Sequence, residues 1–366
     1  MIANGISLFW EQSIPVDLNR PWDMRGALYF FRILENNRKY CLELQQSKQY
    51  KYLLESSDQF DLIVLDHFLQ ECITVLLSKM NKTTIQFSNW PLSDGYIASM
   101  NIPAMPSAVP KTGSLFSGNG MNFWERILNL LYQFFITATR TIQALSMKIY
   151  FNSDIFQIEA RHLIYAGRSE MLTEPIRPIN NRIKFFGSND DNTKQFYQAS
   201  LQVEIIEHKF KAINWAEIEN NKFVLVTFGS ISNIHDMPRQ LLKILLEEFG
   251  KKPYLILWQS NTAQADVAGM SGIQIPRNVR ILKWAPIKLL LVHPSLKFVV
   301  CHGGINTVNE LVSLQVPFIG IPLQGDQNSN LQRLVDLRVI KLLSIREVWD
   351  GKLGETINDF ENSFES

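Results

Sequence analysis

The residues best suited to chemistry stand together at one junction, His302-Gly303-Gly304. An apolar run over residues 296–301 predicts a strand before them, and residues 305–314 have helical spacing after them. Glycine lets backbone N–H groups approach a ligand closely, and the first turn of a helix offers unpaired N–H donors and a positive dipole. The junction therefore predicts an anion site. A glycine-rich turn with a structural histidine is the alternative interpretation.

Polar side chains of the predicted helix extend this junction. Asn306 and Thr307 stand in its first turn, and Glu310 follows them at helical spacing, so all three share one helix face. Together with His302, the first two can donate to phosphate oxygens. The carboxylate of Glu310 can accept hydrogen bonds from ribose hydroxyls.

Two further candidates each follow a predicted strand. Trp284 comes directly after the strand predicted at 279–282, and an aromatic ring there can stack on a nucleobase. Ser230 follows the strand predicted at 223–228, where backbone N–H groups can meet phosphate. A tryptophan that caps the core is the alternative for Trp284.

Asp326 and Gln327 stand at a loop-to-helix junction. A carboxylate beside an amide suits neighbouring sugar hydroxyls. An aspartate that caps the helix is an equally natural interpretation.

The second half of the chain alternates strand and helix patterns, which predicts a doubly wound, mostly parallel sheet. Strands are predicted at 223–228, 254–258, 279–282, 296–301, 317–321 and 339–342, and helices at 238–248, 287–292, 305–314 and 327–337. Ligands of such sheets bind outside the carboxyl ends of the strands, where the candidates above stand.

The first half also predicts an α/β unit, because strand patterns at 60–65 and 83–87 flank a helix. A proline- and glycine-rich loop is expected at 101–120. Residues 123–151 predict one or two amphipathic helices, packed on the protein's own core or, alternatively, lying against a membrane surface or a substrate channel.

The domain boundaries are expected at a polar stretch near the middle of the chain. We place a first domain at 1–190, a linker at 191–220 and a second domain at 221–366.

Composition excludes several classes of protein. The formal net charge of +1 over 366 residues provides no field for a nucleic acid. The three scattered cysteines predict neither a disulfide framework nor a metal site. No apolar run reaches the roughly 18 residues that a membrane-spanning helix needs.

The motifs W-A-P at 284–286, H-G-G-x-N-T-x-x-E at 302–310 and P-L-x-G-D-Q at 322–327 resemble the signature of the UDP-glycosyltransferase family. The resemblance extends through FVLVTFGS and VPFIGIPLQGDQNSN, and more loosely through FDLIVLD and NIPAMPSAVP. It implies two facing Rossmann-like domains of GT-B type, the N-terminal one incomplete. The first domain would bind the acceptor and the second the UDP-sugar.

The resemblance also implies roles for the candidate residues. Trp284 would stack on uracil, and Glu310 would hold the ribose. The diphosphate would be held by His302, Gly303, Gly304, Asn306 and Thr307, with Ser230 beside it. Asp326 and Gln327 would hold the transferred sugar. Asp66 would be the acidic partner of a catalytic histidine. The implied reaction is inverting transfer of a glucuronosyl or glucosyl group to a small lipophilic acceptor, with the UDP-sugar as co-substrate and without a metal or cofactor.

The chain departs from the family pattern at several points. Ile287 replaces a usual glutamine, and no histidine precedes Asp66. His67 as a substitute base is a hypothesis that rests only on its place beside Asp66. The sequence ends at Ser366 without the membrane anchor of animal members. We therefore expect a nematode-like animal member truncated at both ends, placed by resemblance at the endoplasmic reticulum membrane.

Two other functions stay open on the sequence. One is a catalytically silent UDP-sugar-binding module or partner subunit, and product formation would distinguish it from the enzyme. The other is an unrelated Rossmann-type enzyme, which the lack of G-x-G-x-x-G and G-x-x-x-x-G-K-[ST] disfavours. A membrane surface and a homo- or hetero-oligomer remain open as partners.

Overall fold

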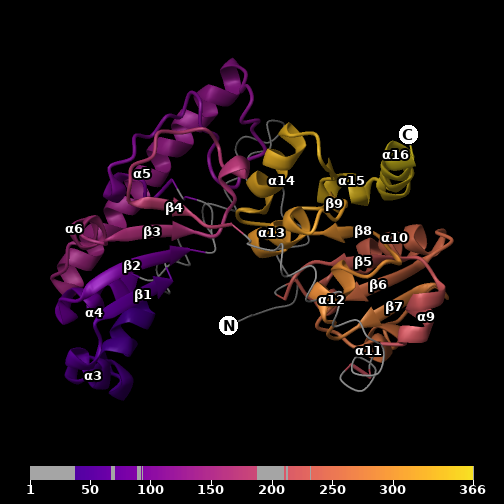
Figure 1. The fold of residues 1–366 in the computed structure, drawn as a ribbon, viewed down its shortest axis with the longest axis horizontal. Coiled ribbons are helices and arrows are strands. Elements are labelled where there is room, and N and C mark those ends of the chain that lie inside the picture. Colours follow the sequence, from indigo (N-terminus) through magenta and orange to yellow (C-terminus); the bar gives the residue numbers. More distant parts are fainter. Residues whose placement is uncertain are drawn as a thin grey trace. The chain divides into compact units, whose positions relative to one another are not determined.

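The computed structural model describes residues 38–66, 71–88, 92, 94–187, 210–211, 213–230 and 232–365. It consists of two compact units, and we call their described parts the N-unit, residues 38–187, and the C-unit, residues 210–365. Each unit is an α/β structure around one parallel sheet, as the sequence predicts (Figure 1). Most of the expected linker, 191–220, lies outside the described residues.

The sheet of the C-unit has six strands in the order β10-β9-β8-β5-β6-β7. They are β5 (Phe223–Thr227), β6 (Leu255–Gln259), β7 (Val279–Leu282), β8 (Leu296–Cys301), β9 (Phe318–Gly320) and β10 (Lys341–Leu342). All neighbouring strands are parallel. The sequence predicts each of these strands to within one or two residues.

Helices cover both faces of this sheet (Figure 1). They are α9 (Trp215–Asn220), α10 (Arg239–Gly250), α11 (Gln264–Ala268), α12 (Ile287–Leu291), α13 (Ile305–Ser313), α14 (Gln327–Asp336), α15 (Ile345–Trp349) and α16 (Leu353–Glu365). The central strand β5 shows why a continuous apolar run is needed. Val224 and Val226 pack with α10, α15 and α16, whereas Phe223 and Leu225 pack with α9, α13 and α14. Side chains alternate between the faces, so a strand covered on both sides must be apolar throughout.

Helix α9 lies within the last residues of the expected linker, 191–220. Asn214 caps this helix by accepting a hydrogen bond from the N–H of Glu217. Trp215 and Ile218 are buried in the core of the C-unit. These contacts attach α9 to the core of the C-unit.

The N-unit has a four-stranded parallel sheet in the order β1-β2-β3-β4. The strands are β1 (Leu62–Asp66), β2 (Thr83–Ser88), β3 (Ile164–Gly167) and β4 (Ile183–Phe185), and its helices include α3 (Lys48–Glu55), α4 (Glu71–Met80), α5 (Phe123–Phe151) and α6 (Ile155–Ala160). The predicted strand–helix–strand unit is confirmed as β1-α4-β2. The sequence analysis missed β3 and β4, which have only four and three residues.

Helix α5 is a single helix over the predicted residues. Asn122 and Glu125 form a capping box at its start, and Asn152 ends it in the left-handed conformation at φ 50°. The preceding loop is tied to this helix: the amide nitrogen of Asn129 donates to the carbonyls of Pro106 at 2.7 Å and Val109 at 2.8 Å. The predicted long loop is therefore ordered by one buried side chain of α5.

A buried ion cluster joins α5 to α4 and α6. The guanidinium of Arg140 donates to Glu71 at 3.1 Å and also to Glu159, and all three side chains are at most 6% exposed. The ring of Tyr96 lies 4.2 Å from the guanidinium carbon, and its hydroxyl donates to Glu71. Each buried charge thus has an opposite charge and further hydrogen bonds, which a buried ion pair requires.

The expectation of no disulfide is wrong, because Cys41 and Cys72 are bonded. Their Cα atoms lie 5.1 Å apart, within the range that disulfides span. The bond links the helical residues 38–46 to α4 across 31 positions. The odd number of cysteines gave no indication of this pair. Cys301, the third cysteine, is buried in the C-unit.

Within the described ranges, no helix combines the length and the apolarity that crossing a bilayer requires.

We predict that Arg140→Met lowers the free energy of unfolding by about 3–5 kcal/mol, because two buried carboxylates lose their cation. Urea unfolding measures this change. Lys82→Met is the matched control in the same unit, since Lys82 pairs with the fully exposed Asp58. We expect it to change stability by less than about 1 kcal/mol. Equal effects of the two substitutions would show that the buried cluster does not stabilise the N-unit.

Candidate functional site

The site begins where β8 leaves the core of the C-unit. Cys301 is completely buried between β5 and β9, and Gly303 then takes a φ of +83°. A Cβ on Gly303 would lie 2.4 Å from Cγ of Leu331 on α14. Both the left-handed backbone and this close approach therefore require glycine.

The imidazole of His302 lies between two backbone segments. A Cβ on Gly229, in the loop after β5, or on Gly304, at the start of α13, would come within 2.7 Å of its Nε2. Burial lowers the pKa of His302 to about 4, partly opposed by a hydrogen bond with the backbone of Thr227. The ring is therefore neutral at pH 7. Its Nδ1 finds no hydrogen-bond partner within the described part of the chain.

The start of α13 provides the backbone donors that the sequence predicts. Gly304 is the N-cap, and no described side chain caps the helix. The N-cap residue therefore supplies no side-chain hydrogen bond to the first-turn N–H groups, which is the arrangement that anion sites at helix starts use. Asn306 is exposed, and Thr307 and Glu310 are partly exposed on the same face. The structure therefore brings the His302 loop and these three side chains together on adjacent segments.

Glu310 has a partner that the sequence analysis did not identify. Nζ of Lys288, on α12, lies 3.4 Å from Oε1 of Glu310. Lys288 directly follows Ile287, the position at which the family pattern has glutamine. A cation therefore stands beside the carboxylate that the sequence assigns to ribose.

Asp326 and Gln327 are buried at the start of α14, 8% and 6% exposed. Oε1 of Gln327 accepts from the N–H groups of Leu323 at 2.8 Å and Gln324 at 2.9 Å. Asp326 occupies the N-cap position but makes no cap hydrogen bond with its side chain. Both side chains order the loop at the carboxyl end of β9.

Asn330 couples this loop to the His302 loop, and the sequence analysis missed it. Its Nδ2 donates to Oδ2 of Asp326 at 2.7 Å and to the carbonyl of Gly303 at 3.1 Å. Burial raises the pKa of Asp326 to about 6, partly opposed by the bond from Asn330. The spacing of four residues between Asp326 and Asn330 on a predicted helix was the available signal.

Trp284 follows β7 and is 59% exposed. The ring of Phe210 stacks on it with centroids 5.3 Å apart. Phe210 lies in the expected linker, so the sequence analysis did not pair the two. An exposed indole, stacked on one side by Phe210, thus stands at the carboxyl edge of the sheet, which suits stacking on a base.

Ser230 is exposed after β5, and its carbonyl accepts a hydrogen bond from Nδ2 of Asn261. That bond ties the loops after β5 and β6. Gly229 precedes Ser230 with a φ of +78°. The loop therefore turns at Gly229, against the His302 ring.

Asp66 belongs to the N-unit, where it is exposed at the carboxyl end of β1. Burial raises the pKa of the nearby Tyr165, and the charge of Asp66 adds a smaller contribution in the same direction. His67, the hypothetical substitute base, lies outside the described residues.

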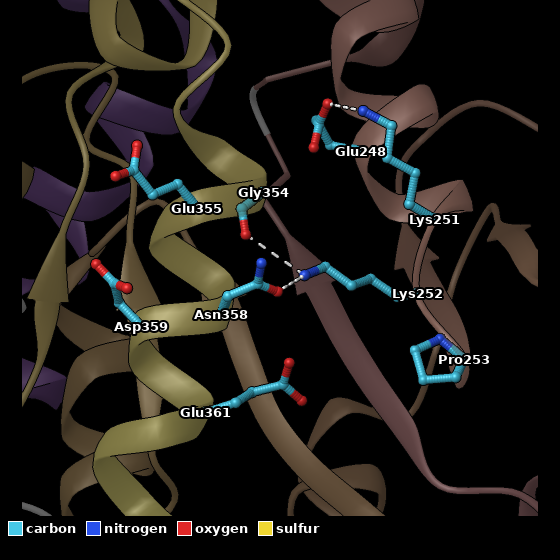
Figure 2. A pocket seen from close by; sticks show the side chains of 9 residues that line it. All are labelled: Glu248, Lys251, Lys252, Pro253, Gly354, Glu355, Asn358, Asp359 and Glu361. Carbon is cyan, nitrogen blue, oxygen red and sulfur yellow. Dashed lines mark hydrogen bonds and ion pairs between the residues drawn. The ribbon is translucent and has the colours of Figure 1, made fainter.

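A separate cavity of about 520 Å³ lies in the C-unit between the segment before β6 and helix α16. It is lined by Glu248, Lys251, Lys252, Pro253, Gly354, Glu355, Asn358, Asp359 and Glu361. Nζ of Lys252 donates to Asn358 at 2.6 Å and to the carbonyl of Gly354 at 3.4 Å. Figure 2 marks both bonds with dashed lines. Pro253 precedes β6 at its amino end, away from the edge at which parallel sheets bind ligands. This acidic cavity is not the predicted anion site.

We predict that Gly303→Ala destabilises the C-unit more than Gly351→Ala does. Both glycines have positive φ, +83° and +78°, but a Cβ on Gly351 meets nothing within 4 Å. Gly351→Ala therefore incurs only backbone strain, about 1–2 kcal/mol. Gly303→Ala adds the collision with Leu331. Urea unfolding of both variants checks this, and equal losses would contradict the close approach of Leu331.

Comparison with known proteins agrees with this geometry. A family model described as UDP-glucoronosyl and UDP-glucosyl transferase matches residues 20–355. UDP-glucuronosyltransferase 3A1 of Mus musculus is 27% identical over 357 residues, which cover 86% of this chain and 60% of that protein. The Homo sapiens protein of that name is 28% identical, with 78% and 54% covered. The chain thus spans somewhat over half the length of these relatives.

Solved structures support the fold. The glycotransferase of kitacinnamycin aligns with a TM-score of 0.57 at 16% identity, covering 92% of this chain and 75% of that one. Os79 from O. sativa in complex with UDP aligns with a TM-score of 0.54 at 14% identity, covering 98% and 82%. Both units therefore have the Rossmann-like architecture of GT-B glycosyltransferases. On the family match over residues 20–355, the chain belongs to the UDP-glucoronosyl and UDP-glucosyl transferase family.

Proposed function

We propose that the C-unit binds a UDP-sugar and that the protein transfers its glucuronosyl or glucosyl group, with inversion, to a hydroxyl of a small lipophilic acceptor. One observation carries this proposal. The neutral ring of His302, with Nδ1 unpartnered among the described residues, stands beside the uncapped start of α13. The first-turn N–H groups offer several donors to one dianionic group, and Nδ1 can join them when the dianion draws a proton onto the ring. Without the ligand the ring is neutral and needs no counterion.

The chemistry of transfer follows from these donors. The acceptor oxygen attacks the anomeric carbon as the bond between that carbon and the diphosphate oxygen breaks. Negative charge grows on the departing UDP, where the first-turn N–H groups and His302 can stabilise it. A single well-placed donor of this kind contributes roughly 10²–10³-fold to the rate.

The remaining side chains of the C-unit would position the donor. The open face of Trp284 would stack on uracil, and Glu310 would accept from the ribose hydroxyls. Asp326, with a pKa of about 6, is mostly ionised at pH 7 and would accept from a sugar hydroxyl. Gln327 would hold a neighbouring hydroxyl, and Ser230 would line the phosphates.

Removal of the proton from the acceptor is assigned to the first domain. Asp66 would orient and stabilise the catalytic base, since it is exposed at the carboxyl end of a parallel strand. His67 as that base rests only on its adjacency to Asp66. No metal or cofactor is part of the proposed step.

We also place the protein in the lumen of the endoplasmic reticulum, at its membrane. The disulfide Cys41–Cys72 supports this, because disulfides persist in oxidising compartments. Asn81-Lys82-Thr83 is an N-glycosylation sequence, and Asn81 is exposed in a turn at φ 49°. A glycan on Asn81 would meet solvent.

Peptide mass spectrometry of the natively produced protein tests this placement. We expect the peptides of Cys41 and Cys72 to be linked before reduction, and the peptide of Asn81 to lose mass on treatment with an N-glycosidase. Free thiols at both cysteines together with an unmodified Asn81 would contradict a lumenal placement.

Titration calorimetry with UDP tests the donor site. We expect His302→Ala to weaken UDP binding about 10- to 100-fold, the value of a hydrogen bond to a charged group. The same substitution should change the affinity for uridine, which lacks phosphate, only slightly. His235→Ala is the matched control, because His235 is 71% exposed in the same unit. Equal UDP affinity of parent and His302→Ala would refute the role of His302. Binding of UDP without product formation would instead identify a silent module.

A further inference from the structure

The side chain of Asn330 lies where two loops of the candidate site meet. It stands on α14 and is 2% exposed. Its Nδ2 carries two hydrogens, and each of them serves a different loop. Nδ2 donates to Oδ2 of Asp326 at 2.7 Å and to the carbonyl of Gly303 at 3.1 Å. One amide therefore joins the carboxylate at the start of α14 to the turn after β8.

The two acceptors fix the direction in which this amide points. Carboxylate and carbonyl oxygens both accept hydrogen bonds, so only the NH2 end of Asn330 can face them. Its Oδ1 is buried and has no hydrogen-bond partner within the described residues. Turning the amide over would place acceptor oxygens against one another and would lose both bonds. The side chain therefore has one orientation, in which a donor points at Asp326.

The carbonyl of Gly303 provides a fixed anchor for this amide. The turn at Gly303 has a φ of +83°, and it packs closely against Leu331, the residue that follows Asn330 on α14. These restraints come from the backbone and from an apolar contact, so we expect the turn to keep its shape without the Asn330 bond. The turn thus holds the amide, and the amide holds Asp326.

The bond also acts on the charge of Asp326. Burial raises the pKa of this carboxyl to about 6, and the hydrogen bond from Asn330 is the largest of the interactions that oppose the rise. The positive charge of Arg333, also on α14, opposes it by a smaller amount. Loss of the Asn330 donor would therefore raise the pKa of Asp326 further.

The elements packed against α14 bring other titratable groups. His302, in the loop after β8, is neutral at pH 7 because burial lowers its pKa to about 4. Glu310, on α13, pairs with Lys288, and Lys341, on β10, is exposed. Within the described residues, the pKa of Asp326 depends on its burial and its own helix and not on these groups.

We infer that Asn330 is a positioning residue, which holds the carboxylate of Asp326 as the acceptor for a sugar hydroxyl of the donor. Its bond engages Oδ2, and Oδ1 would accept from the sugar. This inference rests on the proposed function, because Asp326 must contact the sugar for its position to matter. Recognition of the sugar then depends on Asn330, whereas the diphosphate is held by His302 and the start of α13. On acidification the carboxyl gains a proton, and recognition of the sugar weakens.

Titration calorimetry of the full chain tests the inference. The ligands are UDP and a UDP-sugar, either UDP-glucose or UDP-glucuronate, whichever the parent binds more tightly. Asn330→Leu is similar in size and has no donor. We expect it to weaken binding of the UDP-sugar at pH 7 about 10-fold and binding of UDP less than about threefold. Gln332→Leu is the matched control, because the amide of Gln332 donates to Asp336 at 3.0 Å, also four residues away on α14. It should bind both ligands as the parent does.

The pH dependence separates positioning from a structural role. A UDP-sugar has no group that titrates near neutral pH, so a midpoint in this range belongs to the protein. The parent should lose affinity for the UDP-sugar as the pH falls through about 6, the pKa of Asp326. Asn330→Leu should move this midpoint upward by about one pH unit, because the donor to the carboxylate is lost. Asp326→Asn should remove the midpoint.

A second variant covers the case in which leucine disturbs the packing. Asn330→Asp keeps the shape of the side chain and has no donor when ionised. It should show the same selective loss, with a larger rise of the midpoint, because two carboxylates then face each other.

The inference is overturned if both variants of Asn330 weaken the UDP-sugar and UDP equally, or if Asn330→Leu binds the UDP-sugar as Gln332→Leu does. A midpoint that does not move in Asn330→Leu would also overturn it. If the parent binds neither ligand, the proposed function itself fails. If the parent binds both and the Asn330 variants behave as the control does, only this inference fails.

Discussion

The contact between the His302 ring and two glycine backbones is the constraint on which the candidate site depends. Any Cβ at Gly229 or Gly304 would enter the space of the imidazole. The ring can occupy this space only because β5 and β8 are adjacent parallel strands whose loops leave the sheet at the same edge. The same neighbourhood brings Gly303 against Leu331, which packs α14 under the loop. One close-packed junction therefore positions the histidine, the start of α13 and the start of α14.

Burial gives this junction a consistent electrostatic character. It lowers the pKa of His302 to about 4 and raises that of Asp326 to about 6, so both groups shift toward their neutral forms. The hydrogen bonds from Asn330 connect Asp326 to the loop of Gly303. A site built from neutral donors and a helix start can accept a dianion without first exposing a buried cation. The N-unit differs, because its core contains a charged group, Arg140, which is paired with two carboxylates.

The sequence predicts the C-unit well because its signals are local. Continuous apolar runs such as 223–227 define strands that are covered on both faces, and the glycines after Cys301 mark the turn. Features that depend on tertiary contact were missed. The disulfide Cys41–Cys72 requires two helical segments to pack, Phe210 meets Trp284 across 74 positions, and Lys288 meets Glu310 between two helices. The pattern of α5 predicted its amphipathic nature, but only the burial of Arg140 shows which face points outward.

A structure of the chain with UDP bound tests the central claim most directly. The account predicts the diphosphate at the start of α13, within hydrogen-bond distance of the first-turn N–H groups and His302, with uracil against the open face of Trp284. A nucleotide bound elsewhere, for example in the cavity beside Lys252, or a diphosphate that leaves His302 and α13 untouched, would contradict it.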